Sequence, residues 1–237
     1  MSILPINRYL DHAVLKPEMT QAEAAQQIKV GVKYKVRTVC VRPADIPLAQ
    51  DLCDGSETDI SCVLSFPHGT ALSETKAEEA RRYVQLGISE IDMVVNYGLI
   101  LSGEWERVKE DMAAVCRITK PAGVVLKVIL ETSALNIEQI TRAIELAIEV
   151  GADFVKTSTG FAGGGATDEA IKVMLTAARG RIGVKPSGGV RDYKRAQELV
   201  GMGCSRLGVG YASTPVICSG VLEQIPKEPD APSITSI

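Results

Sequence analysis

Two lysines stand inside stretches of this sequence that otherwise resemble buried strands, where a cation is costly to bury. Lys156 lies in residues 152–160, which begin apolar and then change to small hydroxyl residues and a glycine, and Lys185 lies in residues 182–189. A desolvated lysine that is kept partly neutral can attack a carbonyl carbon and form a Schiff base. The alternative is a lysine that extends to the end of its strand or pairs with a carboxylate.

A second lysine nearby favours the chemical role. A free lysine has a pKa of about 10.4, so only roughly one in a few thousand is neutral at pH 7. An ammonium about 4 Å away, at an effective dielectric constant of about 20, disfavours protonation by roughly 4 kcal/mol, which is about three pKa units. We therefore predict that Lys156 is the nucleophile and that the nearby charge of Lys185 favours the neutral form of Lys156. We predict that Asp92 balances the charge of Lys185 and moves protons.

Asp92 and Lys127 also stand within apolar runs. Four inward-pointing charges of mixed sign could instead satisfy one another as a buried network with no chemical role. Two lysines on strands that we expect to be neighbours favour the chemical role over this alternative.

Eight apolar, β-branched runs recur along the chain, and their lack of alternation predicts parallel strands covered on both faces. The runs are residues 10–15, 37–41, 60–66, 90–95, 124–130, 154–157, 182–185 and 206–209. Amphipathic helical patterns lie between them, and glycines such as Gly87 and Gly151 end helices just before a strand. The sequence therefore predicts an α/β fold, a single closed (β/α)8 (TIM) barrel over residues 1–224, with a mobile tail at 225–237. An open doubly wound sheet is the runner-up, but no G-x-G-x-x-G follows the first run.

In such a barrel the chemistry lies at the C-terminal ends of the strands. Polar residues that we expect near those ends, besides the four charged ones, are Asp11, His12, Cys40, Arg42, Asn96, Glu131 and Thr132. Glycines follow the last two runs, at Gly188 and Gly189 and at Gly208 and Gly210. Loops in these places commonly bind phosphate through bare backbone N–H groups, and Arg191 could assist.

Composition and charge exclude several classes of protein. The net charge of -3, with no long basic block, argues against nucleic-acid binding. Every apolar run has only the length of a strand, so we expect no membrane span. The sequence has only two histidines and no H-E-x-x-H, which argues against a metal-dependent lyase or hydrolase. Six scattered cysteines and the absence of a signal peptide predict reduced thiols and a cytoplasmic protein.

The residues between about Leu10 and Gly210 match one known family in order and spacing. The matching stretches are residues 11–17 (DHAVLKP), 38–41 (TVCV), 65–69 (SFPHG), 90–96 (EIDMVVN), 126–132 (LKVILET), 154–160 (FVKTSTG) and 184–189 (VKPSGG). In these stretches the chain resembles deoxyribose-phosphate aldolases, class I enzymes that cleave 2-deoxyribose 5-phosphate to acetaldehyde and glyceraldehyde 3-phosphate without a metal or organic cofactor.

The resemblance implies a role for individual residues. Lys156 matches the Schiff-base lysine, Lys185 the second lysine, and Asp92 the acid/base aspartate. The implied substrate-binding residues are Asp11, Cys40, Thr159, Gly160, Gly188, Gly189, Gly208 and Gly210. The implied partners are a small aldehyde and a sugar phosphate, and the implied assembly is a homodimer or homotetramer.

The chain departs from the family at the end of the last strand. Where the family usually has glycine, a small residue and two serines that help to hold phosphate, this chain has residues 208–211, Gly-Val-Gly-Tyr. The residues after Val216 contain no tyrosine, so the C-terminal tyrosine that assists catalysis in some members is absent. Two alternatives follow: an aldolase with an altered or non-phosphorylated acceptor, because Gly210 and Tyr211 replace the serines, or a non-catalytic binding barrel. Retention of both lysines and Asp92 weighs against the second alternative.

Overall fold

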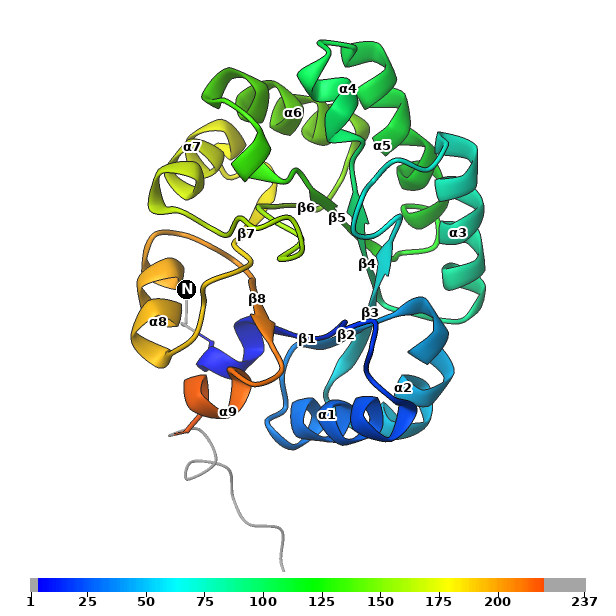
Figure 1. Cartoon of the computed structure of the whole chain (residues 1–237), viewed down its shortest axis with the longest axis vertical. Coiled ribbons are helices and arrows are strands. Elements are labelled where there is room, and N and C mark those ends of the chain that lie inside the picture. The colour runs from blue at the N-terminus through cyan, green and yellow to red at the C-terminus, as the bar shows by residue number, and fades with distance from the viewer. Residues whose placement is uncertain (1–3, 220–237) are drawn as a thin grey trace, which may run out of the picture.

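The computed structural model describes residues 4–219, in which eight strands form one parallel sheet. The strands are β1 (Leu10–Val14), β2 (Thr38–Val41), β3 (Asp59–Leu64), β4 (Glu90–Val94), β5 (Val125–Ile129), β6 (Phe154–Lys156), β7 (Gly183–Lys185) and β8 (Leu207–Gly210). They run in the order β7-β6-β5-β4-β3-β2-β1-β8, and an isolated bridge between Ser187 and Gly208 joins the two end strands. Figure 1 shows the strands around a centre with the helices outside them, so the predicted (β/α)8 barrel is confirmed.

The helices cover the outside of the barrel and connect its strands. They are α1 (Gln21–Lys33), α2 (Ile46–Cys53), α3 (Ser73–Gln85), α4 (Tyr97–Leu101), α5 (Trp105–Thr119), α6 (Ile137–Val150), α7 (Asp168–Ala178), α8 (Tyr193–Gly201) and α9 (Thr214–Ile217). Short 3-10 helices are η1 (Ile6–Tyr9), η2 (Pro43–Asp45) and η3 (Thr132–Ala134). Asn136 precedes α6 and forms a capping box with Gln139, and the Thr167 side chain caps α7.

The main hydrophobic core lies between the strands and the helices rather than inside the barrel. Ile91 and Met93 of β4 belong to this core, whereas Glu90 and Asp92 of the same strand are buried in the charged interior. Successive side chains of a strand point to opposite faces, so the two kinds of residue alternate. The expectation of strands without alternation is therefore wrong for β4, because the inside of this barrel is filled partly by charge.

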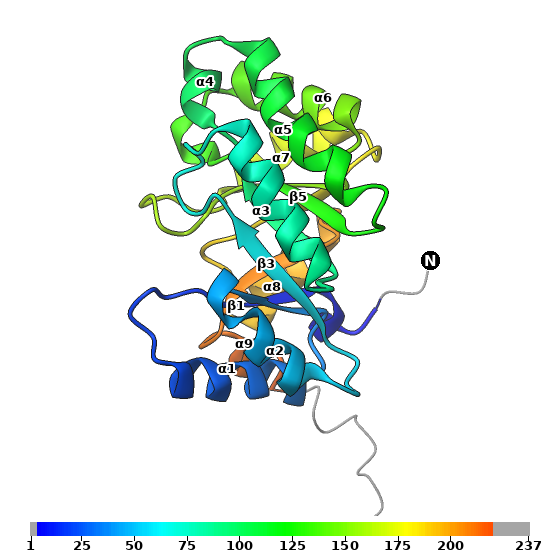
Figure 2. The same ribbon diagram turned by 90° about the vertical axis from the view of Figure 1, so that its right-hand side faces the viewer.

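The loops after β1 and after β6 project on the same side of the molecule in Figure 2, opposite to the N-terminal segment. This is the side on which the strands end, so the loops can cover residues placed there. Of the predicted boundaries, both the end of the barrel at 224 and the tail at 225–237 lie outside the described residues. Within residues 4–219 no helix is both long and apolar enough to cross a bilayer.

Candidate active site

Lys156 and Lys185 are the last residues of two adjacent strands. In the register of β6 and β7, Lys156 is directly opposite Lys185. Opposed residues of neighbouring strands point to the same face of a sheet, so both side chains enter the barrel. Their exposed fractions are only 3% and 1%. The expectation that the two lysines share one space is confirmed by this register.

Asp92 joins the two lysines. Its Oδ2 accepts a hydrogen bond from Nζ of Lys156 at 2.8 Å and from Nζ of Lys185 at 2.7 Å. Its other oxygen, Oδ1, accepts from Nζ of Lys127 at 2.8 Å. One fully buried carboxylate therefore contacts three lysines, and two of them share one oxygen atom.

Three more residues, Asp11, Glu90 and Arg206, extend this arrangement into what we call the barrel charge cluster: Asp11, Glu90, Asp92, Lys127, Lys156, Lys185 and Arg206. Nζ of Lys127 lies 2.5 Å from Glu90 Oε2 and 3.0 Å from Asp11 Oδ2. Arg206 donates to Asp11 Oδ1 at 2.7 Å and to Glu90 Oε2 at 2.8 Å. Lys185 also donates to Asp11. Hydroxyl groups complete the shell, since Thr38 donates to Asp11 at 2.8 Å.

The cluster holds more positive than negative groups. Within it, four cations face three carboxylates, and all seven side chains are buried. A buried excess charge is unfavourable because little solvent is present to screen it. The cluster therefore favours the loss of one proton from a lysine, and a neutral lysine is the form that can act as a nucleophile or a base.

The pKa shifts show where the charges are held firmly. Burial alone would raise the pKa of Asp92, but Lys127, Lys156 and Lys185 together hold it well below its usual value. Burial alone would lower the pKa of Lys127, but Asp11, Asp92 and Glu90 raise it well above its usual value. For Lys185, burial lowers the pKa, and the neighbouring lysines outweigh part of the opposing effect of Asp11 and Asp92. Lys185 therefore releases its proton more readily than a lysine in water.

A cavity of about 510 Å³ opens beside the cluster, at the C-terminal ends of β1, β6, β7 and β8. We call it the distal pocket; among the residues that line it are Lys16, Gly160, Phe161, Gly188, Gly210 and Tyr211. Gly208, which also lines it, has no room for a side chain, since a Cβ there would lie 2.6 Å from Ser187 Oγ and 3.3 Å from Lys185 Cε. The wall of the pocket at Gly208 therefore lies directly against Lys185 and Ser187.

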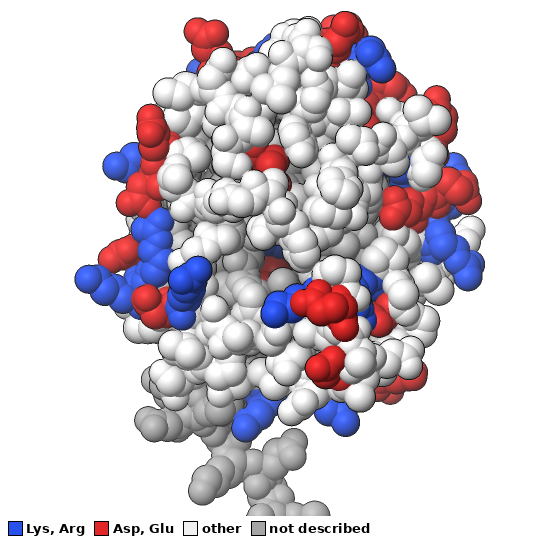
Figure 3. All heavy atoms as spheres, in the orientation of Figure 1, with Lys and Arg blue, Asp and Glu red and all other residues white. Residues whose placement is uncertain are grey.

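The rim of the distal pocket carries aromatic rings and glycine backbone. Phe161 packs edge-on against Phe66, with ring centroids 5.2 Å apart. Gly188 and Gly189 both have φ of +85°, a conformation that L side chains rarely adopt. Within residues 4–219 the backbone N–H groups of Gly160, Gly188 and Gly189 donate no hydrogen bond, so they are available to a ligand. In Figure 3 the charged side chains on this face stand mostly towards its rim, with one group of both signs nearer the centre.

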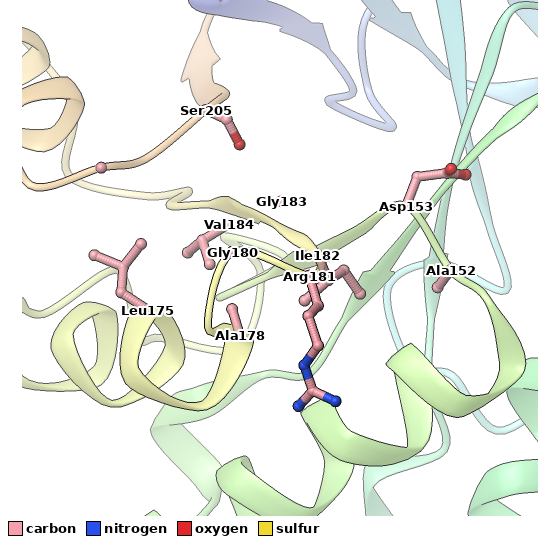
Figure 4. Close-up of a pocket in the computed structure, with 11 residues that line it drawn as sticks. Ala152, Asp153, Leu175, Ala178, Gly180, Arg181, Ile182, Gly183, Val184 and Ser205 are labelled. Atoms are coloured by element: carbon pink, nitrogen blue, oxygen red, sulfur yellow. The ribbon is translucent and has the colours of Figure 1, made fainter.

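A second cavity, of about 480 Å³, lies at the other end of the barrel. Residues that precede β6, β7 and β8 line it, among them Asp153, Arg181 and Ser205. In Figure 4 the Arg181 guanidinium extends away from Asp153 and Ser205 rather than converging with them. This cavity is at the N-terminal ends of the strands, away from the lysine side chains, and TIM-barrel enzymes react at the C-terminal ends.

The structure brings some of the predicted substrate-binding residues to the distal pocket and leaves others away from it. Cys40 is buried beside Val63 inside the barrel, and its thiol has a pKa raised by burial and by Asp92. Thr159 is buried and, with Gly160, lines the distal pocket. Gly189 and Arg191 do not line it.

Other polar residues at the strand ends make hydrogen bonds that stabilise the fold rather than hydrogen bonds to the cluster. His12 points outward between Thr214 and the carbonyl of Gln27, and burial lowers its pKa to about 4. Asn96 caps α4. Glu131 accepts hydrogen bonds from N and Oγ1 of Thr159 rather than from a lysine of the cluster.

Glu90 and Arg206 also belong to the cluster, although neither was predicted as a site residue. Glu90 is two residues before Asp92 on the same strand, so the strand period of two was a usable signal for it. Arg206 immediately precedes β8, and its guanidinium carbon lies 5.2 Å from the centroid of the Phe154 ring. Nothing in the sequence around Arg206 indicates that it belongs to the cluster. In the described part of the chain, no group of three or more His, Cys, Asp or Glu side chains is arranged to hold a metal ion.

Comparisons with known proteins agree on one family. The profile of the DeoC/LacD family aldolases matches residues 6–211. A deoxyribose-phosphate aldolase of Natranaerobius thermophilus is 42% identical over 208 residues, which cover 88% of this chain and 94% of that protein. Deoxyribose-phosphate aldolase 1 of Staphylococcus aureus is 40% identical over 205 residues, covering 86% and 92%.

Solved structures give the same result. An aldolase called QR15 superposes with a TM-score of 0.86 at 35% identity, covering 94% of this chain and 98% of that one. The deoxyribose phosphate aldolase from Aeropyrum pernix, described as having a unique tetrameric structure, has a TM-score of 0.80 at 27% identity, covering 93% and 92%. A mandelate oxidase at 16% identity and a TM-score of 0.62 shares the fold alone.

Proposed function

The chain belongs to the DeoC/LacD family aldolases, and we propose that it cleaves 2-deoxyribose 5-phosphate to acetaldehyde and glyceraldehyde 3-phosphate through a Schiff base on Lys156. The observation that carries the assignment of residues is the shared Oδ2 of Asp92, which holds Lys156 and Lys185 together in a cluster with one excess positive charge. Such a cluster favours the loss of a proton from a lysine, and the pKa of Lys185 is lowered by burial and by its lysine neighbours.

The reaction begins with attack of the neutral Lys156 amine on C1 of the open-chain sugar. The adduct loses water and becomes an iminium ion, which withdraws electrons from C2. When the C3 hydroxyl loses its proton, the C2–C3 bond breaks, and its electron pair forms the enamine of acetaldehyde on Lys156. Protonation of C2 and hydrolysis of the iminium then release acetaldehyde and restore Lys156.

Asp92 and Lys185 divide the proton transfer between them. Asp92 alone is a weak base, because its pKa lies well below the usual value for a carboxyl group. Lys185, whose Nζ lies 2.7 Å from the same oxygen, has a lowered pKa, and in its neutral form it can accept the proton that leaves the C3 hydroxyl. We therefore propose that the proton passes along Asp92, through water where needed, to Lys185 and returns later to C2.

The phosphate end of the substrate fits the distal pocket. The N–H groups of Gly160 and Gly188 are free of partners within the described residues and line this pocket, beside the lysines. Backbone N–H groups bind phosphate without a side-chain hydroxyl, so the absence of serines at positions 210 and 211 does not remove the binding site. The cytoplasmic location and assembly as a dimer or tetramer stay predictions.

A steady-state assay tests this function. We expect the purified chain to release acetaldehyde and glyceraldehyde 3-phosphate from 2-deoxyribose 5-phosphate, with undiminished rate in excess EDTA. Lys156→Met should lower kcat/KM by at least about 10⁴-fold, because the covalent route is lost. Absence of cleavage by the unmodified chain, or activity retained in Lys156→Met, would overturn the proposal.

A further inference from the structure

The distal pocket has one cationic side chain among its lining residues, and the reaction scheme above gives it no role. Lys16 follows β1, and its Nζ lies 5.8 Å from the centroid of the Tyr211 ring. The negative face of an aromatic ring attracts an ammonium group, so Tyr211 favours a conformation in which Lys16 stays over the pocket.

The backbone beneath Lys16 is fixed although its side chain is exposed. The N–H of Met19 donates to the carbonyl of Lys16 at 3.2 Å, which makes a tight turn with Pro17 at its second position. Arg42 Nη1 donates to the carbonyls of Lys16 and Met19, each at 2.9 Å, and more weakly to that of Pro17 at 3.3 Å. Asp45 in turn holds the Arg42 Nε at 2.6 Å. Only the side chain of Lys16 must then be ordered when a ligand binds, which lowers the entropic cost.

We propose that Lys16, held by Arg42 and Tyr211, is the side-chain cation that recognises the dianionic phosphate of the substrate at the mouth of the distal pocket. This inference rests on the proposed function and assigns a specificity residue to it. The glycine N–H groups hold the phosphate from the β6 and β7 loops, whereas Lys16 approaches from the β1 loop. Lys16 thereby supplies a full charge that neither Gly210 nor Tyr211 provides.

Glu18 provides a matched control for Lys16, because it lines the same cavity and has the opposite charge. A carboxylate near a bound phosphate is repulsive, and a lysine is attractive. The two residues lie in the same turn, so their variants disturb the backbone in similar ways and differ in the sign of the charge that they remove. The pair is therefore an internal control for electrostatics.

The test compares cleavage of 2-deoxyribose 5-phosphate with cleavage of 2-deoxyribose. We expect Lys16→Met to lower kcat/KM for the phosphorylated sugar about tenfold, as loss of one charge-assisted hydrogen bond would, mainly through KM. The rate with 2-deoxyribose should not fall. Glu18→Gln should leave kcat/KM for the phosphorylated sugar unchanged or raise it. Added salt should weaken the preference for the phosphorylated over the non-phosphorylated sugar, and this weakening should be smaller in Lys16→Met than in the unmodified chain.

Arg42→Met tests whether Arg42 positions Lys16 by holding the backbone beneath it. This variant should raise KM for the phosphorylated sugar without changing kcat for 2-deoxyribose. An undiminished preference for phosphate in Lys16→Met overturns the proposal about Lys16. An unmodified chain that cleaves neither sugar overturns the proposed function instead. An unmodified chain that prefers 2-deoxyribose contradicts the role of Lys16 and identifies a non-phosphorylated acceptor.

Discussion

Lys76 and Lys185 are both almost completely buried, yet their surroundings differ in one respect that separates structure from chemistry. Lys76 on α3 donates to Asp111 Oδ2 at 2.7 Å and to the carbonyl of Val94 at 2.9 Å. Asp111 also accepts from the N–H of Asn96 at 2.9 Å. One cation faces one carboxylate, and this pair joins α3, α5 and the end of β4.

The barrel charge cluster has no such balance. Its four cations compete for three carboxylates, and Asp92 contacts three lysines at once. In the isolated pair, burial raises the pKa of Asp111 and lowers that of Lys76. In the cluster the lysines instead hold the pKa of Asp92 well below its usual value. Burial lowers the pKa of both Lys76 and Lys185, so burial does not distinguish them. What distinguishes Lys185 is the surplus of cations around a carboxylate that it shares with Lys156.

Removing Lys185 should abolish the charge surplus that distinguishes the cluster from the Lys76–Asp111 pair. We expect this change to lower activity more than the removal of Lys76 does. In Lys185→Met three cations face three carboxylates, so the cluster has no surplus charge and the proton acceptor is lost. We expect kcat/KM at neutral pH to fall about 10³-fold, in the range seen for loss of a general base.

The pH profile identifies the cause. In the unmodified chain, activity rises with pH as the surplus proton leaves, and the lowered pKa of Lys185 places this rise below that of a free lysine. In Lys185→Met the rise should move to higher pH. A profile of kcat/KM that keeps its shape, or activity near that of the unmodified chain, would contradict the role of the surplus charge.

Removing Lys76 should have the smaller effect on activity and a larger one on stability. Lys76→Met leaves Asp111 buried without its cation, which typically costs about 3–5 kcal/mol of unfolding free energy. Urea denaturation measures this loss, and the double variant Lys76→Met/Asp111→Leu should recover part of it. In the folded protein kcat should stay within about threefold of the original. A loss of kcat comparable to that of Lys185→Met would remove the distinction between the two regions.

Much of the barrel and the central site could be predicted because strand register places residues that end neighbouring strands side by side. Lys156 and Lys185 end consecutive strands, so their meeting follows from topology. The sequence also indicates the caps of α6 and α7, since capping depends on residues only three apart.

The missed features depend on contacts between residues far apart in the chain. Lys76 lies in a helix rich in charge, and its local sequence does not mark it as a buried residue. The structure buries Lys76 beside Ala80 and Tyr83, because Asp111, 35 residues later, supplies a partner. Arg206 likewise joins Asp11, 195 residues earlier, and no local pattern predicts this.

The most direct test of the central claim is to reduce the enzyme with borohydride in the presence of acetaldehyde and to locate the adduct by peptide mass spectrometry. The proposed arrangement predicts one N-ethyl group, on Lys156, with Lys76, Lys127 and Lys185 unmodified. The same treatment of Lys156→Met should give no adduct within the barrel. An adduct on Lys185 or Lys127, or none on Lys156, would contradict the assignment of the nucleophile.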